Sequence, residues 1–81
     1  MSKNNSFSKL VGSNIRRYRL KRGLTQEKLS FLLKTSNEYI SFLENGRKDV
    51  RIETLNRIGK ALDVEPYLFL VPPKRTTGKS G

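Results

Sequence analysis

Apolar side chains recur every three or four residues in four successive segments of the 81-residue chain. The segments cover about residues 8–22, 26–34, 37–45 and 52–62. The positions expected to face inward are Val11, Ile15 and Tyr18, then Leu29, Leu32 and Leu33, then Ile40 and Leu43, and finally Ile52, Leu55, Ile58 and Leu62. This spacing gathers the apolar side chains on one face of each helix. Because no segment alternates in the manner of a strand, the pattern predicts an all-α fold.

The C-terminal part of the chain predicts a short fifth helix followed by a tail. Pro66 suits the first turn of a helix, and Pro72-Pro73 would end it. Residues 1–7 and 72–81 have the mostly polar composition of flexible termini, and the C-terminal one is basic. We therefore expect a single five-helix domain over residues 8–71.

Local signals divide the middle of the chain into two short helices joined by a tight turn. Thr25 can cap the helix that follows it, and Ser36 can cap the next one. The turn falls at residues 34–36, and Gly46 suits a left-handed position after the second helix. This arrangement predicts a helix-turn-helix over about residues 25–45, with the second helix free to enter DNA.

The charge balance indicates a polyanionic partner. Lys and Arg outnumber Asp and Glu by 17 to 7, which gives a formal net charge of +10 and an isoelectric point of about 10.4. Such a surplus favours nucleic acid or an anionic membrane surface. The membrane alternative is weak, because no apolar run approaches the roughly 18 residues of a spanning helix and no signal-peptide pattern is present.

The chain contains neither Cys nor His. The lack of Cys excludes disulfides and thiolate metal sites and suits a reducing cytoplasm. The lack of His removes the commonest general base and metal ligand, and no nucleophile–base pair or phosphate loop is present. We expect a cytoplasmic DNA-binding protein that has no catalytic residues, no metal and no cofactor.

A helical wheel assigns candidate base contacts to the third predicted helix. Its outward side presents Asn37, Glu38, Ser41, Phe42 and Asn45. A recognition helix places its N-terminal residues against base edges, so Asn37, which can pair with adenine, and Glu38, which can accept from cytosine, are the first candidates. Both could instead only stabilise the start of the helix. Phe42 could pack on a thymine methyl group, meet a partner or cover the loop.

Five side chains, Asn45 among them, are expected at phosphates. Gln26 begins the second predicted helix, where free backbone N–H groups can meet a phosphate, although a capping role is the alternative. Arg47 and Lys48 follow the recognition helix in a loop that should lie against the sugar-phosphate backbone, unless the loop is simply solvated. The outward-facing Arg16 and the helix-terminal Asn45 complete this set.

Arg19 has a different expected role. On the wheel it lies close to the buried face that contains Ile15. A nearly buried Arg needs an anion, and Glu44 at the end of the recognition helix can supply one. We expect Arg19 and Glu44 to form a structural ion pair without contacting DNA.

At these residues the chain resembles the phage-repressor and Cro-like helix-turn-helix regulators, the XRE-type family. The resemblance extends over about residues 12–70 and rests on Ile15-Arg16, Arg19, Gly-Leu-Thr-Gln at 23–26, Leu29, Tyr39-Ile40-Ser41, Leu-Glu-Asn-Gly-Arg at 43–47, Thr54-Leu55 and Ala-Leu-Asp-Val at 61–64. It implies a lambda-repressor-like domain in which Gln26 touches the DNA backbone and Arg19 pairs with Glu44. It also implies that bases are read by Ser36, Asn37, Glu38 and Ser41.

The sequence departs from the family pattern at three places. Lys34 stands in the turn where Gly is common, so either the turn is wider or Lys34 itself adopts an unusual backbone. Ser30 replaces a small Ala, which is a mild change. Val50-Arg51 replace the usual Pro and Ser-like cap before the fourth helix, which leaves Asp49 as an alternative cap.

Five consecutive apolar residues near the C-terminus predict a homodimer interface. They are Tyr67, Leu68, Phe69, Leu70 and Val71. A helix of barely two turns cannot direct all five into its own core, so some must stay exposed or meet a partner. The alternative is that Phe7 and Leu10 cover the free side. Family members usually dimerise, which places two recognition helices about 34 Å apart on a near-palindrome.

These features favour a homodimeric, sequence-specific and autoregulatory regulator of transcription that binds double-stranded DNA. A chain of this length resembles the small controller proteins of restriction-modification systems, and it also fits mobile-element repressors. The alternative is an antitoxin-like interaction module that binds a protein partner through its apolar C-terminal segment. Non-specific packaging of nucleic acid would need the charge but no readout residues.

Overall fold

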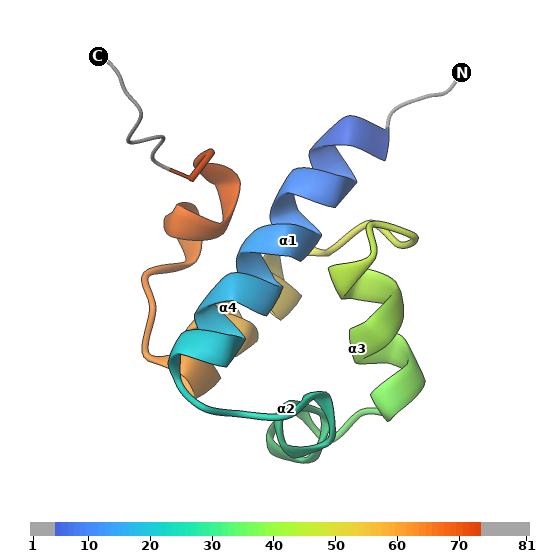
Figure 1. Ribbon diagram of the computed structural model, residues 1–81, viewed down its shortest axis with the longest axis vertical. Helices are drawn as coiled ribbons and strands as arrows, with labels where there is room; N and C mark the ends of the chain where they lie inside the picture. Colours follow the sequence, from blue (N-terminus) through green and yellow to red (C-terminus); the bar gives the residue numbers. More distant parts are fainter. Residues whose placement is uncertain (1–4, 74–81) are drawn as a thin grey trace.

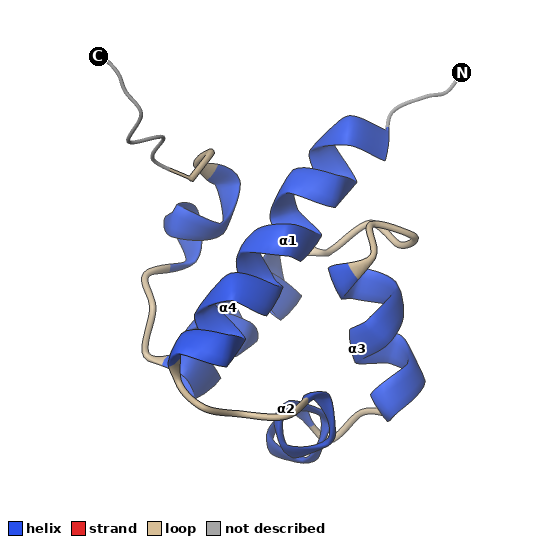
Figure 2. Cartoon of the chain, in the orientation of Figure 1, coloured by secondary structure: helices blue, strands red, loops and turns tan. Residues whose placement is uncertain are grey.

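The computed structural model describes residues 5–73, which form an all-helical domain (Figures 1 and 2). The elements are α1 (Asn5–Lys21), α2 (Gln26–Leu33), α3 (Asn37–Glu44), α4 (Ile52–Leu62) and the 3-10 helix η1 (Pro66–Leu70). In Figure 1, α3 and η1 lie on opposite sides of α1, and α2 lies below them. The all-α class is confirmed over these residues. The expected basic tail lies outside the described residues from position 74 onward, as do residues 1–4 of the expected N-terminal tail.

The N-terminal end of α1 lies earlier than the sequence indicated. Residues 5–7, expected in a flexible terminus, belong to the helix. The physical reason is an anchor one residue later: the Ser8 side chain is buried, and its Oγ donates a hydrogen bond of 2.9 Å to Asp49 Oδ1. This bond also corrects the expected cap of α4, because the Asp49 carboxylate faces α1 while Arg51 precedes α4 without a side-chain cap.

The expected fifth helix is a 3-10 helix of five residues. Asn14 in α1 accounts for its short length. The Asn14 side chain is buried, and its Nδ2 donates to the carbonyl oxygens of Phe69 and Val71 at 2.8 and 2.9 Å. These carbonyls are therefore satisfied by a side chain from another helix instead of by a further turn of η1.

All five elements contribute to one core. It consists of Val11, Ile15, Leu29, Leu33, Ile40, Leu43, Leu55, Ile58, Leu62 and Phe69. Tyr18 packs edge-on against Phe69, with ring centroids 5.8 Å apart. Two residues expected to face inward do not, since Leu32 is 46% exposed and Ile52 is 85% exposed. Periodicity identifies the apolar face of a helix, but no neighbouring element among the described residues covers these two positions.

Candidate nucleic-acid interface

Both helices of the helix-turn-helix begin at the expected caps. The Thr25 hydroxyl oxygen accepts from the Lys28 backbone N–H at 3.0 Å, and the Ser36 hydroxyl oxygen accepts from the Tyr39 N–H at 3.0 Å. Each bond satisfies one of the N–H groups that a helix start leaves without an intrahelical acceptor. The caps fix the first residue of α3 at Asn37 and so fix which side chains project from its first turn.

The turn is tight because Lys34 adopts a left-handed backbone, with φ 58° and ψ 47°. The Thr35 N–H then donates to the Ser30 carbonyl at 2.9 Å, as in a Schellman motif. Of the two alternatives for a turn without Gly, the unusual backbone at Lys34 is correct. Gly46 ends α3 in the same conformation, with φ 71°, as expected.

Gly12 allows α1 to lie directly against the end of α3. A Cβ atom at position 12 would be 2.1 Å from the Leu43 carbonyl oxygen and 2.9 Å from that of Glu44. On its other side, α3 buries Ile40 and Leu43 completely. The recognition helix is thus held both by its apolar side chains and by its backbone.

The expected ion pair joins α1 to α3. Arg19 Nε donates to Glu44 Oε2 at 2.6 Å, and its Nη2 donates to Glu44 Oε1 at 3.0 Å. Arg19 Nη1 also donates to the Leu24 carbonyl at 2.7 Å. Both charged residues are 7% exposed. The bidentate geometry and full burial agree with a structural role for this pair.

Gln26 has a contact that the sequence did not indicate. Its Nε2 donates to Glu44 Oε1 at 3.0 Å, so the side chain is attached to the buried ion pair. Gln26 is half-buried at the first position of α2. Its amide oxygen faces no donor among the hydrogen bonds of the described residues.

The candidate DNA contacts lie on α3, on the loop after it and on α1. Those exposed are Ser36, Asn37, Glu38, Phe42, Asn45, Arg47, Lys48 and Arg16, whereas Ser41 is half-buried. Asn45 Nδ2 donates to the Ser41 carbonyl at 2.9 Å, which closes the last turn of α3. The exposed candidates thus follow α3 from its polar first turn, which includes the acidic Glu38, past Phe42 to the cationic loop.

The C-terminal apolar run divides into a buried part and an exposed part. Phe69 is completely buried in the core of its own chain, so its expected place in a dimer interface is wrong. Tyr67, Leu70 and Val71 are exposed, and Leu68 is half-buried. Phe69 faces the core because the carbonyl bonds from Asn14 set the rotation of η1 against α1.

An open apolar groove of about 650 Å³ lies between the start of α4 and η1. Its lining includes Ile52, Leu55, Pro66, Tyr67 and Leu70. Sequence reasoning missed the exposure of Ile52. The signal was its place as the first residue of α4, where no preceding helical turn can shield it.

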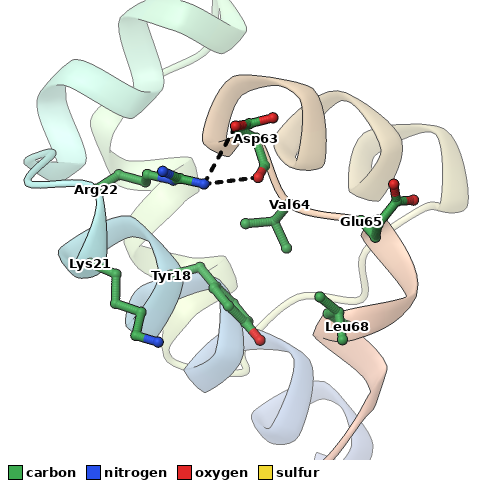
Figure 3. Close-up of a pocket in the computed structure, with 7 residues that line it drawn as sticks. All are labelled: Tyr18, Lys21, Arg22, Asp63, Val64, Glu65 and Leu68. Atoms are coloured by element: carbon green, nitrogen blue, oxygen red, sulfur yellow. Dashed lines mark hydrogen bonds and ion pairs between the residues drawn. The ribbon is translucent and has the colours of Figure 1, made fainter.

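A second hollow, of about 570 Å³, lies where α1 meets the end of α4 (Figure 3). Arg22 crosses its edge, with Nε donating to the Leu62 carbonyl at 2.7 Å and Nη2 donating to the Asp63 carbonyl at 3.0 Å. These bonds satisfy carbonyls at the C-terminus of α4, near Asp63, which is left-handed with φ 58°. Arg22 therefore has a capping role.

Residues 5–73 contain neither a metal-binding cluster nor a membrane-spanning helix. No group of His, Cys, Asp and Glu side chains in residues 5–73 could hold a metal ion. None of the helices in that range is long and apolar enough to cross a membrane.

Comparisons with known proteins identify the family. A family model described as helix-turn-helix matches residues 15–69. The HTH-type transcriptional regulator y4dJ of Sinorhizobium fredii is 40% identical over 68 residues, which cover 84% of this chain and 88% of that protein. The control protein C.BamHI of Bacillus amyloliquefaciens is 38% identical over 63 residues, covering 76% and 78%.

A solved structure agrees with this relationship. The restriction-modification controller protein C.AhdI of Aeromonas hydrophila superposes with a TM-score of 0.75 at 30% identity, covering 79% of this chain and 97% of that one. The chain thus belongs to the helix-turn-helix family of XRE type, a family of non-enzymatic, DNA-binding regulators of transcription.

Proposed function

We propose that this protein is a homodimeric, sequence-specific regulator of transcription that binds a near-palindromic operator close to its own gene. The observation that carries the proposal is that α3 is buried on one side and exposed at its first turn. One side of this helix is completely buried at Ile40 and Leu43, while its capped first turn exposes Asn37 and Glu38 to solvent. A short helix held in this way presents a fixed set of polar groups to the major groove.

The exposed side chains divide into two roles in this proposal. Asn37 and Glu38, with Ser36, Ser41 and Phe42 beside them on the outer side of the helix, read base edges. Arg16, Gln26, Asn45, Arg47 and Lys48 contact phosphates, which position the helix without reading sequence. The donation to Glu44 uses one N–H of the Gln26 Nε2 and leaves the second N–H for a phosphate, beside the free backbone N–H groups at the start of α2.

The proposed dimer uses the apolar groove between α4 and η1. Ile52, Tyr67, Leu70 and Val71 are exposed and apolar, and a second copy of the chain would cover them. One recognition helix reads too few base pairs to select a single site in a genome. A two-fold dimer doubles the contacts and requires a matching symmetry in the operator.

The relatives suggest the biological setting. A control protein and a restriction-modification controller protein are both similar to most of this chain. We therefore propose a controller of that kind, with a mobile-element repressor as the neighbouring possibility. Its place of action would be the cytoplasm, where such a regulator meets its operator.

A footprint on the DNA upstream of the gene, with excess random competitor, tests the proposal. The expected result is protection of two symmetric half-sites separated by one helical turn or a multiple of it. Protection that disappears with the competitor would refute sequence-specific binding, because only the charge of the protein would then attract DNA.

The same apolar groove favours one alternative, an antitoxin-like module that binds a different protein there. A partner in stoichiometric amount that stays bound at high salt would support this alternative. A homodimer mass in sedimentation, with no such partner, would support the regulator.

A further inference from the structure

The outward face of α1 carries cations at helical spacing. Lys9, Ser13 and Arg16 are all exposed and follow one another at intervals of four and three residues. Residues at these intervals lie on one face of a helix. We name this set the α1 ridge. Its opposite face contains Val11 and Ile15, which are buried in the core, so the ridge is held in a fixed orientation.

The ridge begins at the loop that follows the recognition helix. A Cβ atom at Gly46 would lie 2.8 Å from Lys9 Cα, so the backbones of α1 and the loop are in direct contact there. Arg47 and Lys48 come next in that loop and are exposed. Figure 1 shows the loop after α3 lying next to α1. The ridge therefore extends the cationic surface of the loop along α1.

Of the two neighbouring carboxylates, Glu44 is neutralised inside the protein, and the exposed Asp49 is hydrogen-bonded but keeps its charge. Asp49 accepts a hydrogen bond from Ser8, and Glu44 is paired with Arg19 inside the protein. Ser13 donates its hydroxyl to the Leu10 carbonyl at 3.0 Å, so it presents a short and flat side chain between the two cations. A phosphate backbone can therefore approach the helix closely between Lys9 and Arg16.

We propose that the α1 ridge binds two phosphates of the DNA backbone, with Lys9 contacting a phosphate that the helix-turn-helix does not reach. Lys9 and Arg16 are seven residues apart, about 10.5 Å along the helix axis at about 1.5 Å per residue, so they serve different phosphates. The inference rests on the proposed function and adds Lys9 to it.

The test compares Lys9→Gln with Lys60→Gln, a matched change at an exposed Lys in the last turn of α4. Affinity is measured against salt concentration on operator and on random duplex. Lys9→Gln should lower the slope of log affinity against log salt by about one unit and weaken binding to both duplexes alike. Lys60→Gln should change neither, and Arg16→Gln should reproduce the loss at a separate position.

Ethylation interference on the operator then identifies the phosphate. Modification of one phosphate should block the wild-type protein and lose its effect in Lys9→Gln. An unchanged slope for Lys9→Gln, or an unchanged interference pattern, would overturn the inference. Because the slope on random duplex does not require an operator, the inference is tested even if sequence-specific binding itself fails.

Discussion

Replacing Arg19 with Ala tests how the recognition helix is held in place. The change removes two hydrogen bonds to Glu44 and one to the Leu24 carbonyl. It leaves a buried carboxylate for which Gln26 is the remaining side-chain donor among the described residues. Removing one partner of a buried pair costs about 3–5 kcal/mol, because the other charge stays buried without compensation.

This loss is large for a chain of 81 residues. At about 0.05–0.15 kcal/mol per residue, its free energy of unfolding is expected at roughly 4–12 kcal/mol. Each 1 kcal/mol moves the thermal midpoint of a small domain by about 4–8 °C. Arg19→Ala should therefore lower the midpoint by at least about 12 °C, measured by circular dichroism at fixed salt.

The double variant Arg19→Met/Glu44→Leu is the matched control. It removes both charges and keeps apolar volume, so it should recover most of the stability lost in the single variant. Equal losses in the two variants would show that packing of the side-chain stems matters more than the pairing of charges. An unchanged midpoint for Arg19→Ala, together with weaker DNA binding, would refute the structural role.

The remaining predictions concern the placement of the recognition helix, the dimer and the readout. Gly12→Ala forces a methyl group against the Leu43 carbonyl. It should lower the free energy of unfolding, measured in urea, by about 1–3 kcal/mol and also weaken operator binding. An unchanged unfolding curve would contradict this close contact. Ile52→Lys places a charge in the exposed groove and should shift the sedimentation of the protein to a monomer while the thermal midpoint at low concentration stays nearly constant. Asn37→Ala should lower the free energy of binding to the operator by about 1–3 kcal/mol and relax the preference for one base pair. Arg47→Ala should weaken binding to all duplexes alike and lower the slope of log affinity against log salt by about one unit. Equal losses on operator and random DNA for both variants would refute the readout assignment.

The helix-turn-helix could be predicted from the sequence because its boundaries depend on local chemistry. Thr25 and Ser36 cap helices through bonds to backbone N–H groups three residues away. Gly46 adopts the left-handed backbone at the end of α3 because it has no side chain. The ion pair between Arg19 and Glu44 could also be predicted, because a charged side chain on an apolar helical face requires a partner.

The errors arose where the answer depended on a distant element. Ile52 has the periodicity of a core residue; its place at the start of α4 was a local warning, but only the fold shows that η1 leaves it uncovered. Phe69 was assigned to an interface because its run is apolar throughout, and only the rotation of η1 against α1 buries it. A signal for that rotation existed in Asn14, which lies three residues after Val11 and four before Tyr18 and so places an amide on an apolar face.

Helix α1 connects the two surfaces that the proposed function needs. At Gly12 and Arg19 it is attached to α3, and at Asn14 it is attached to η1 and hence to one wall of the apolar groove. All three attachments are buried. Gly12 and Asn14 contact backbone carbonyls, and Arg19 pairs with a carboxylate. The recognition helix and the proposed dimer surface are thus fixed to one rigid element. In a two-fold dimer the distance between the two recognition helices would then be set by the packing of α1, so the spacing of half-sites that the protein accepts should be narrow.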